Sequence, residues 1–251
     1  MERTILSIEK QANRQFEYIV IDGGSTDGSK EIIEKYAGSI TAWVSENDRG
    51  IYHAMNKGIA MATGTYLLFL NSGDELNHDG SFQAALKNLS GEDLIYCNIL
   101  LVTEKSEIPK KYPEKLSFPY MLSDSLPHPA TFIRKQLFDI TNGYDESLKI
   151  CSDWSFFMRV LFKYDASYKH LDILLSRFYL DGISSSEQFR AVHLAERAKI
   201  LETHFGRFAE LIALWKEDSK LKTILKSSRL IKLARMAGFL KPLDFVDEKN
   251  T

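Results

Sequence analysis

The chain alternates between short apolar runs and longer segments in which apolar residues recur every three or four positions. Runs 17–22 and 65–70 are apolar on both faces, which is typical of strands buried inside a sheet. Segments 29–36 and 50–62 carry their apolar residues on one helical face. This alternation of strands and helices predicts an α/β fold with a three-layer, mainly parallel sheet.

The same patterns predict the rest of the chain. Residues 103–127 are polar and interrupted by prolines, which indicates an excursion over one face of the sheet. From residue 185 the pattern is mostly helical, so we expect a domain at 1–185 followed by a helical extension at 186–251. The expected helices are 2–13, 29–36, 50–62, 81–89, 135–141 and 154–163. The expected strands are 17–22, 42–45, 65–70, 93–101 and 130–133, followed by a strand or strand pair at 168–175 and 177–180.

Composition limits the function classes. A length of 251 residues with 44% hydrophobic content suits one sizeable domain with an appendage. The net charge of −2 gives no reason to expect nucleic acid as a partner. Two cysteines, Cys97 and Cys151, suit a reducing compartment. Neither a membrane-spanning run nor a signal-peptide core is present, so a soluble, cytoplasmic protein is expected.

The most informative feature is a pair of apolar strands that each run into an acidic, glycine-bearing loop. Asp22 ends the first strand, and Asp74 follows the second in the loop Asn71-Ser-Gly-Asp74. Ligands of open α/β sheets bind at the carboxyl ends of the strands. A carboxylate repels bare phosphate, so the pair indicates a bridging cation or a hydroxyl-rich group such as a sugar. Asp74 could equally cap the structure that follows it.

Three further positions carry candidate chemistry, each with a structural alternative. Asp48 and Arg49 stand in a loop after a third strand, where they line a pocket or form a solvated turn. Asp153 begins an amphipathic helix, so it acts as a general base or as an N-cap. His128, between two prolines, is a ligand-binding or a structural histidine.

The order of these motifs resembles the family 2 glycosyltransferases, which are inverting enzymes with the GT-A (Rossmann-like) fold. The resemblance covers about residues 2–185 and is nearest to bacterial members that build cell-surface polysaccharides. The residues that carry it are Tyr18-Ile-Val-Ile-Asp-Gly-Gly-Ser-Thr-Asp-Gly28, Asp48-Arg-Gly-Ile-Tyr52, Ala54-Met-Asn-Lys-Gly58, Ala62-Thr-Gly-Thr-Tyr-Leu-Leu-Phe-Leu-Asn-Ser-Gly-Asp74, His128-Pro-Ala-Thr-Phe132, Gly143-Tyr-Asp-Glu146 and Ser152-Asp-Trp154.

The resemblance implies a role for each candidate residue. Asp153 would be the catalytic base and Asp74 would hold Mg²⁺ or Mn²⁺ on the diphosphate of the donor. His128 would contact the acceptor, which is a glycan or a lipid-linked sugar. The nucleotide-sugar donor would be bound by Asp22, Gly24, Ser25, Asp48, Arg49 and Asn56.

The chain also departs from the family pattern. Asn71 and Gly73 replace acidic positions of the family's DxD loop, Gly23 replaces a second Asp, and Ser152 replaces a Glu. Met1 stands at the helix that follows the family's first strand, so we expect a sheet without that strand, through a late gene start or a damaged product. These departures favour an alternative function, a catalytically impaired remnant or scaffold that binds a partner glycosyltransferase or a membrane. A third hypothesis for the function is a nucleotidyltransferase.

The segment 214–241 alternates aliphatic and basic residues. This pattern predicts an amphipathic basic helix, which lies on the inner face of the plasma membrane or packs on the catalytic domain.

Overall fold

The computed structural model describes residues 1–11, 15–77, 80–180, 189–206 and 217. Met1–Arg197 form one compact unit, and Ala198–Thr251 form a second. The first unit carries every site residue discussed below. The predicted basic helix at 214–241 lies outside the described residues, apart from Glu217.

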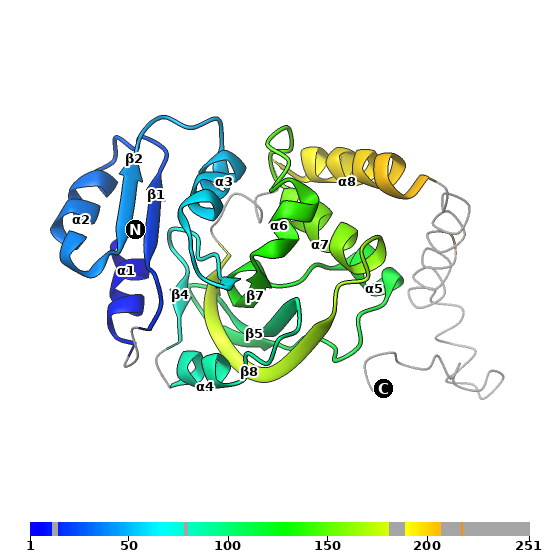
Figure 1. Ribbon diagram of the computed structural model, residues 1–251, viewed down its shortest axis with the longest axis horizontal. Helices are drawn as coiled ribbons and strands as arrows, with labels where there is room; N and C mark the ends of the chain where they lie inside the picture. The colour runs from blue at the N-terminus through cyan, green and yellow to red at the C-terminus, as the bar shows by residue number, and fades with distance from the viewer. Residues whose placement is uncertain (12–14, 78–79, 181–188, 207–216, 218–251) are drawn as a thin grey trace. The chain divides into compact units, whose positions relative to one another are not determined.

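A small sheet of two strands begins the α/β pattern. Strands β1 (Ile19–Asp22) and β2 (Ala42–Ser45) pair in parallel. They are joined through helix α2 (Ser29–Lys35) and the short helix η1 (Ala37–Ser39), as a parallel crossover requires (Figure 1). Val20, Ile33 and Ile40 form the buried core of this βαβ unit.

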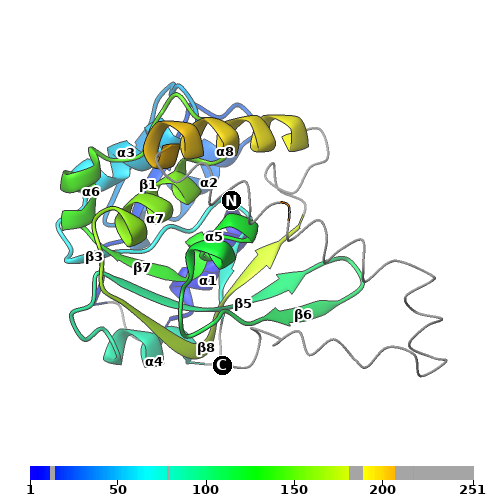
Figure 2. The same ribbon diagram turned by 90° about the vertical axis from the view of Figure 1, so that its right-hand side faces the viewer.

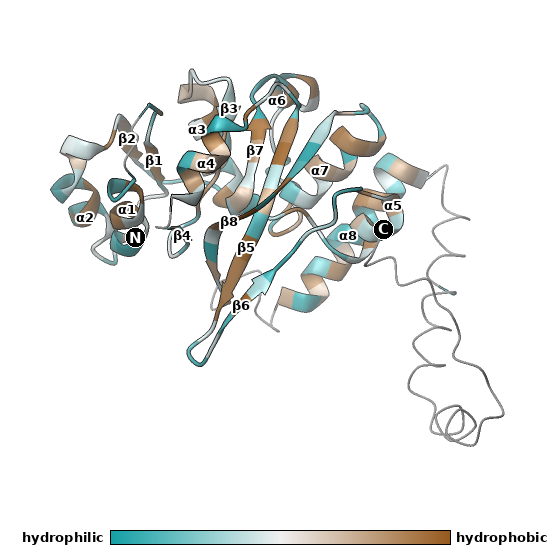
Figure 3. Ribbon diagram, turned by 90° about the horizontal axis from the view of Figure 1, so that it is seen from below, coloured by the Kyte–Doolittle hydropathy of each residue, from teal (hydrophilic) through white to brown (hydrophobic). Residues whose placement is uncertain are grey.

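A second sheet has six strands, in the order β3-β7-β5-β8-β4, with β6 on the edge of β5. Strand β5 is at its centre and is drawn largely brown in Figure 3, because apolar residues fill it. Leu94, Ile95, Tyr96 and Cys97 have no solvent exposure. The strands are β3 (Tyr66–Leu67), β4 (Glu75–Leu76), β5 (Leu94–Val102), β6 (Glu107–Lys110), β7 (Thr131–Arg134) and β8 (Tyr168–Tyr179).

Helices cover this second sheet on both faces. Figures 1 and 2 show α4 on one side and α6 with α7 on the other. The remaining elements are α1 (Glu2–Glu9), α3 (Ile51–Met61), α4 (Ser81–Lys87), α5 (Phe118–Ser123), η2 (His128–Ala130), α6 (Gln136–Thr141), α7 (Ser152–Phe162) and α8 (Arg190–Phe205).

The predicted α/β fold is confirmed, and its strand pairing is mixed. Among the described strands, β1–β2 and β5–β8 pair in parallel, whereas four other pairs are antiparallel. The βαβα alternation that suggests parallel pairing ends before β5. Strand β6 then returns from β5 through a tight turn, which forces an antiparallel pair.

Several predicted boundaries also change. Helix α1 ends at Glu9, and of the expected strand 65–70 only Tyr66–Leu67 pairs as a strand. Of the strand or strand pair expected at 168–180, the structure has one continuous strand, β8, whose pairing with β5 shifts register. The excursion at 103–127 contains β6 and α5. Within the described residues, no helix is both long and apolar enough to cross a bilayer.

The central position of β5 predicts a large stability difference between two otherwise similar substitutions. Ile95→Ala, at a site with 0% exposure, is expected to lower the free energy of unfolding by about 2–5 kcal/mol, because it leaves a cavity in the core. Ile108→Ala on β6, where the side chain is 54% exposed, should change it by less than about 0.5 kcal/mol. Urea denaturation of both variants compares them, and equal losses would contradict a core centred on β5.

Candidate active site

Six of the nine candidate site residues line one cavity of about 1250 Å³ within the first unit. This volume exceeds the roughly 300–1,000 Å³ of usual ligand pockets, so the cavity has room for more than one ligand. Its polar part lies where β1, the loop before α3, the loop after β3 and the start of α7 converge. The candidate residues on its lining are Asp22, Ser25, Asp48, Asp74, His128 and Asp153.

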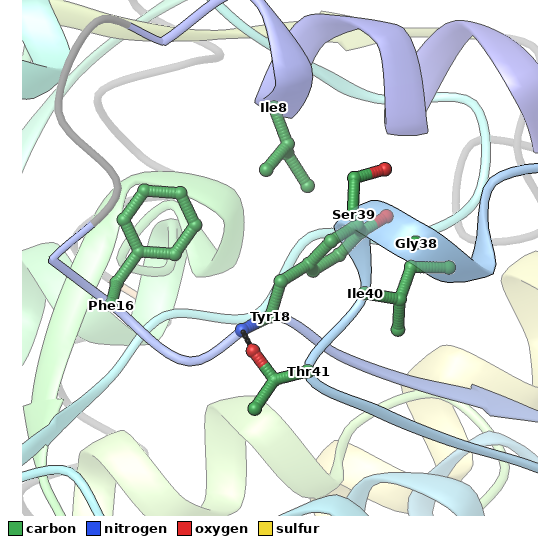
Figure 4. Close-up of a pocket in the computed structure, with 7 residues that line it drawn as sticks. All are labelled: Ile8, Phe16, Tyr18, Gly38, Ser39, Ile40 and Thr41. Atoms are coloured by element: carbon green, nitrogen blue, oxygen red, sulfur yellow. Dashed lines mark hydrogen bonds between the residues drawn. The ribbon is translucent and has the colours of Figure 1, made fainter.

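A second, smaller pocket of about 230 Å³ lies at the other end of β1. Figure 4 shows Tyr18 and Ile8 pointing into it, with the Tyr18 backbone N–H donating to Thr41 Oγ1 at 3.0 Å. None of the candidate catalytic residues lines this pocket. It shares Ile8, Phe16 and Tyr18 with the lining of the large cavity and so adjoins that cavity.

Asp22 ends β1 as a buried carboxylate, only 3% exposed. It accepts hydrogen bonds from the backbone N–H groups of Gly24 (3.2 Å) and Ser25 (3.1 Å) and from the Ser45 hydroxyl (2.7 Å). Burial opposes ionisation of Asp22, but the hydrogen bonds from Ser25, Ser45 and Gly24 outweigh it and hold the pKa below its ordinary value. The carboxylate is thereby fixed, ionised, at the floor of the cavity.

Asp48 lies against the glycines that follow Asp22. Its Oδ1 accepts the backbone N–H of Gly50 at 2.9 Å, which orients the carboxylate. A Cβ atom at Gly23 would collide with Oδ2 of Asp48, and one at Gly24 would lie 2.5 Å from Asn47 Oδ1. Gly24 also has φ of +82°, which favours glycine. The glycine at position 23, a departure from the family pattern, thus makes room for Asp48.

Asp74 is buried in the loop after β3, with 5% exposure. Its Oδ1 accepts the backbone N–H of Tyr179 at 3.2 Å. The preceding residue, Gly73, donates its N–H to Thr4 Oγ1 at 2.8 Å and accepts a hydrogen bond from Arg3 Nε at 2.8 Å. Helix α1 and strand β8 therefore fix the position of this carboxylate from two sides.

The acidic residues do not form an all-protein metal cage. Among the described residues, no group of three or more His, Cys, Asp or Glu side chains is placed to hold an ion. Mg²⁺ in nucleotide-dependent sites commonly takes one or two carboxylates, with phosphate oxygens and water completing its shell. The donor set around Asp74 fits that arrangement, in which the ion arrives with a diphosphate.

Asp153 lies in the first turn of α7 and is half-buried on the cavity wall. The Tyr52 hydroxyl lies 3.1 Å from Asp153 Oδ1 and 2.5 Å from the Ile150 carbonyl oxygen. The Trp154 backbone N–H also donates to Oδ1, at 2.8 Å. Because the contacts from Tyr52 and Trp154 both fall on Oδ1, the second oxygen of the carboxylate is the one that can accept a proton. The N-cap of α7 is Cys151, so the alternative of Asp153 as N-cap does not describe the helix.

Two residues that shape this corner were not among the sequence candidates. The carboxylate of Glu196 accepts the backbone N–H groups of Lys149 (2.6 Å), Ile150 (3.0 Å) and Cys151 (2.9 Å) ahead of α7. Tyr52 holds Asp153 from α3. Tyr52 lies inside a motif singled out above, but Glu196 follows α7 by more than 30 positions and has no local signal.

His128 belongs to an aromatic cluster rather than to an open surface. Its ring stacks on Phe69 at a centroid distance of 4.9 Å, and its Nε2 lies 2.8 Å from the Tyr144 hydroxyl. The side chain is 7% exposed, and burial lowers its pKa, which favours the neutral ring. His128 thus forms part of the cavity wall.

Three predicted donor-binding residues lie off the cavity lining. Arg49 is exposed and forms a 2.5 Å ion pair with Glu146. The side-chain amide of Asn56 donates to the Tyr144 carbonyl (2.9 Å) and to Glu146 (3.0 Å), which ties α3 to the loop before α7. Gly24 contributes its backbone N–H to Asp22. Their roles in donor binding stay predictions.

The mixed sheet with carboxylate-bearing loops at its strand ends is the GT-A fold. A solved structure of Staphylococcus aureus TarS (residues 1–349) with UDP-GlcNAc is similar at a TM-score of 0.59 and 21% identity, covering 82% of this chain and 67% of that one. The mannosyltransferase PcManGT of Pyrobaculum calidifontis, with GDP-Man and Mn²⁺, is similar at a TM-score of 0.56 and 13% identity, covering 92% and 78%.

The sequence establishes the family. The model of glycosyl transferase family 2 matches residues 1–160, and the chain belongs to that family. A PGL/p-HBAD biosynthesis glycosyltransferase of Mycobacterium bovis is 30% identical over 161 residues, which is 61% of each chain. An uncharacterized glycosyltransferase of Rickettsia typhi is 27% identical over 263 aligned positions, covering all of this chain and 76% of that one. This chain therefore spans about three fifths of the mycobacterial relative.

The lowered pKa of Asp22 predicts a pH-dependent contribution to stability. Because the folded-state pKa lies below the ordinary value of 3.8, the stabilisation is fully present above about pH 4 and is lost as the pH falls through the lowered pKa. Asp22→Asn should therefore reduce the free energy of unfolding by about 1–3 kcal/mol at pH 7, and by progressively less below pH 4.

Urea unfolding at pH 7, 4 and 3 measures this difference. Asp139→Asn, at an exposed position of α6, is the matched control and should change stability little at any of these values. A deficit for Asp22→Asn that stays constant across the range would contradict a role for the ionised carboxylate.

Proposed function

We propose that this chain transfers a sugar from a nucleotide-diphosphate sugar to an acceptor hydroxyl with inversion at the anomeric carbon. The observation that carries the proposal is the convergence of Asp22, Asp48, Asp74 and Asp153 on one cavity. Three of these carboxylates suit the polar donor. Asp22 and Asp48 would contact its hydroxyl-rich groups, and Asp74 would lie beside its diphosphate. The fourth carboxylate, Asp153, lies on a different element, in the first turn of α7.

Asp153 is the proposed base. Its carboxylate takes the proton of the acceptor hydroxyl, whose oxygen forms a bond to the anomeric carbon while the bond from that carbon to the phosphate oxygen breaks. Attack from the face opposite the nucleoside diphosphate inverts the configuration. Tyr52 and the Trp154 N–H hold one carboxylate oxygen in place, so they position the other toward the acceptor.

A divalent cation, Mg²⁺ or Mn²⁺, fits the site as a partner of Asp74. When bound, it neutralises negative charge on the diphosphate of the departing nucleotide. Asp74 would hold it together with phosphate oxygens and water, since no group of three or more His, Cys, Asp or Glu side chains is placed to hold an ion among the described residues. The presence of Mn²⁺ and GDP-Man in the PcManGT structure supports this proposal.

The relatives support a role in cell-surface glycan synthesis. The mycobacterial relative is named for PGL/p-HBAD biosynthesis, and TarS was solved with UDP-GlcNAc. We propose a glycan or lipid-linked acceptor that enters beside His128 and Asp153, which line the same cavity.

Removal of the proposed base should separate chemistry from binding. Asp153→Asn is expected to reduce sugar transfer by roughly 10²–10⁴-fold, because the amide cannot accept the proton, while donor affinity changes little. Transfer is measured as nucleoside diphosphate release in the presence of acceptor, and donor affinity by calorimetry. Asp139→Asn on the exposed face of α6 serves as the control. Parallel loss of binding and transfer would make Asp153 a structural residue.

Metal binding should require the nucleotide. Calorimetry with Mn²⁺ alone is expected to show no binding, whereas UDP or GDP should bind more tightly when Mn²⁺ is present, because the diphosphate supplies most of its ligands. Asp74→Asn should abolish the metal-dependent gain and leave the metal-free affinity of the nucleotide nearly unchanged. Tight Mn²⁺ binding without nucleotide would contradict this assignment.

One observation favours a second candidate, a scaffold that binds a partner without catalysing transfer. The described strands β1 and β3 share no hydrogen bonds, although the candidate carboxylates stand at their ends. Such a scaffold would give no nucleotide-dependent heat with Mn²⁺. A nucleotidyltransferase fits less well, because Asp153 lies on the cavity wall outside any group of three or more metal-binding side chains among the described residues, as a base for an acceptor would.

A further inference from the structure

Two neighbouring charged residues of helix α8, Glu196 and Arg197, contact the turn that carries the proposed base. Both are half-buried and belong to the first unit. The Glu196 carboxylate accepts the backbone N–H groups of Lys149 (2.6 Å), Ile150 (3.0 Å) and Cys151 (2.9 Å). Because these three residues directly precede α7, Glu196 fixes the backbone from which that helix starts.

The start of α7 depends on this contact with another helix. Its N-cap residue, Cys151, makes no side-chain capping hydrogen bond. Helix N-termini carry unpaired backbone N–H groups and a partial positive charge, so a carboxylate is favoured there. Glu196 supplies that carboxylate from α8. The position of the first turn of α7 is therefore set partly by α8.

The guanidinium of Arg197 holds the other side of the same turn. It lies over the Trp154 ring, 4.4 Å from the ring centroid. Its Nη1 donates to the Leu122 carbonyl at 3.2 Å and its Nη2 to the Asp124 carbonyl at 3.4 Å. The indole N–H of Trp154 donates to the Met121 carbonyl at 2.7 Å. The first turn of α7 is thereby packed between α8 and the C-terminal end of α5.

A chain of hydrogen bonds runs from Glu196 to Asp153. Ile150 is held at both ends, because its N–H donates to Glu196 and its carbonyl oxygen accepts the Tyr52 hydroxyl at 2.5 Å. The same hydroxyl lies 3.1 Å from Asp153 Oδ1. A hydroxyl has one hydrogen, so Tyr52 can donate to only one of these two oxygens at a time. A shift of Ile150 would therefore change the contact between Tyr52 and Asp153.

We propose that Glu196 and Arg197 are positioning residues for Asp153, which together fix the turn that carries the base. Both lie off the cavity lining, so they act through Asp153 rather than on a substrate. A base must lie within hydrogen-bond distance of the proton that it takes, and a misplacement of about 1 Å can lower a rate by roughly 10²-fold. The inference rests on the proposed function, because Asp153 acts as a base only in sugar transfer.

Glu196→Gln tests the structural part of this proposal without any transfer reaction. Glutamine has the same shape, but its NH₂ group cannot accept a backbone N–H. Amide exchange measured by NMR should become roughly 10-fold faster at residues 149–151, and faster also at Trp154, whose N–H donates to Asp153 Oδ1. A purely local capping role would leave Trp154 unchanged. Glu202→Gln, at an exposed position of the same helix, is the matched control and should alter neither.

Hydrolysis of UDP-GlcNAc or GDP-mannose with Mn²⁺ gives the second readout, since water then takes the place of the acceptor. Glu196→Gln should lower kcat by roughly 10–100-fold and change KM for the donor by less than about 2-fold. In an Asp153→Asn background it should cause no further loss, because Glu196 acts only through Asp153. Arg197→Lys is a second variant. It keeps the charge but loses the planar fork, so it should also speed exchange at Trp154 and lower kcat.

Two results would overturn the inference. One is unchanged exchange at Trp154 in both variants, and the other is a full additional loss of hydrolysis when Glu196→Gln is combined with Asp153→Asn. Hydrolysis of neither donor by the unaltered chain would count against the proposed function instead. In that case the exchange at Trp154 decides whether α8 positions Asp153.

Discussion

The carboxylates at the centre of this site, Asp22 and Asp74, stand at the ends of strands that share no hydrogen-bond ladder. What holds these strands side by side is a set of side-chain bridges, with Glu17 at one end and helix α1 at the other. A side-chain bridge fixes a position less firmly than a continuous sheet does, since each rests on one or two hydrogen bonds. The separation of Asp22 and Asp74 therefore depends on these side-chain contacts rather than on a shared ladder.

Much of the α/β character follows from the sequence, because periodicity and turn chemistry are local properties. The βαβ unit around β1 and β2 and helix α7 were predicted close to their observed bounds. The pairing of the strands does not follow from the sequence in the same way, because the direction of β7 beside β5 depends on contacts between segments far apart in the chain. The strand at 65–70 shows the same limit. Its composition predicts full burial, but only Tyr66–Leu67 finds a partner strand.

The site residues also divide into those that the sequence predicts and those that it does not. Residues on loops directly after strands, such as Asp22 and Asp74, can be found from the sequence because strand ends point to the cavity. Asn56 and Arg49 lie off the lining, where hydrogen bonds to the loop at 143–146 hold them. The role of Glu196 could not be predicted from the sequence, because its three backbone partners precede α7 while Glu196 itself lies on α8. Such bridges form between distant segments and leave no pattern along the chain.

The central claim is that the loops after β1 and β3 act together on one nucleotide-sugar. Hydrogen exchange of the full chain, with and without Mn²⁺ and either UDP-GlcNAc or GDP-mannose, tests it most directly. The account predicts that one of these donors slows exchange in residues 22–25 and in residues 71–74 together, and that Mn²⁺ strengthens the effect. Protection of one loop without the other, or of neither with any donor, would contradict it.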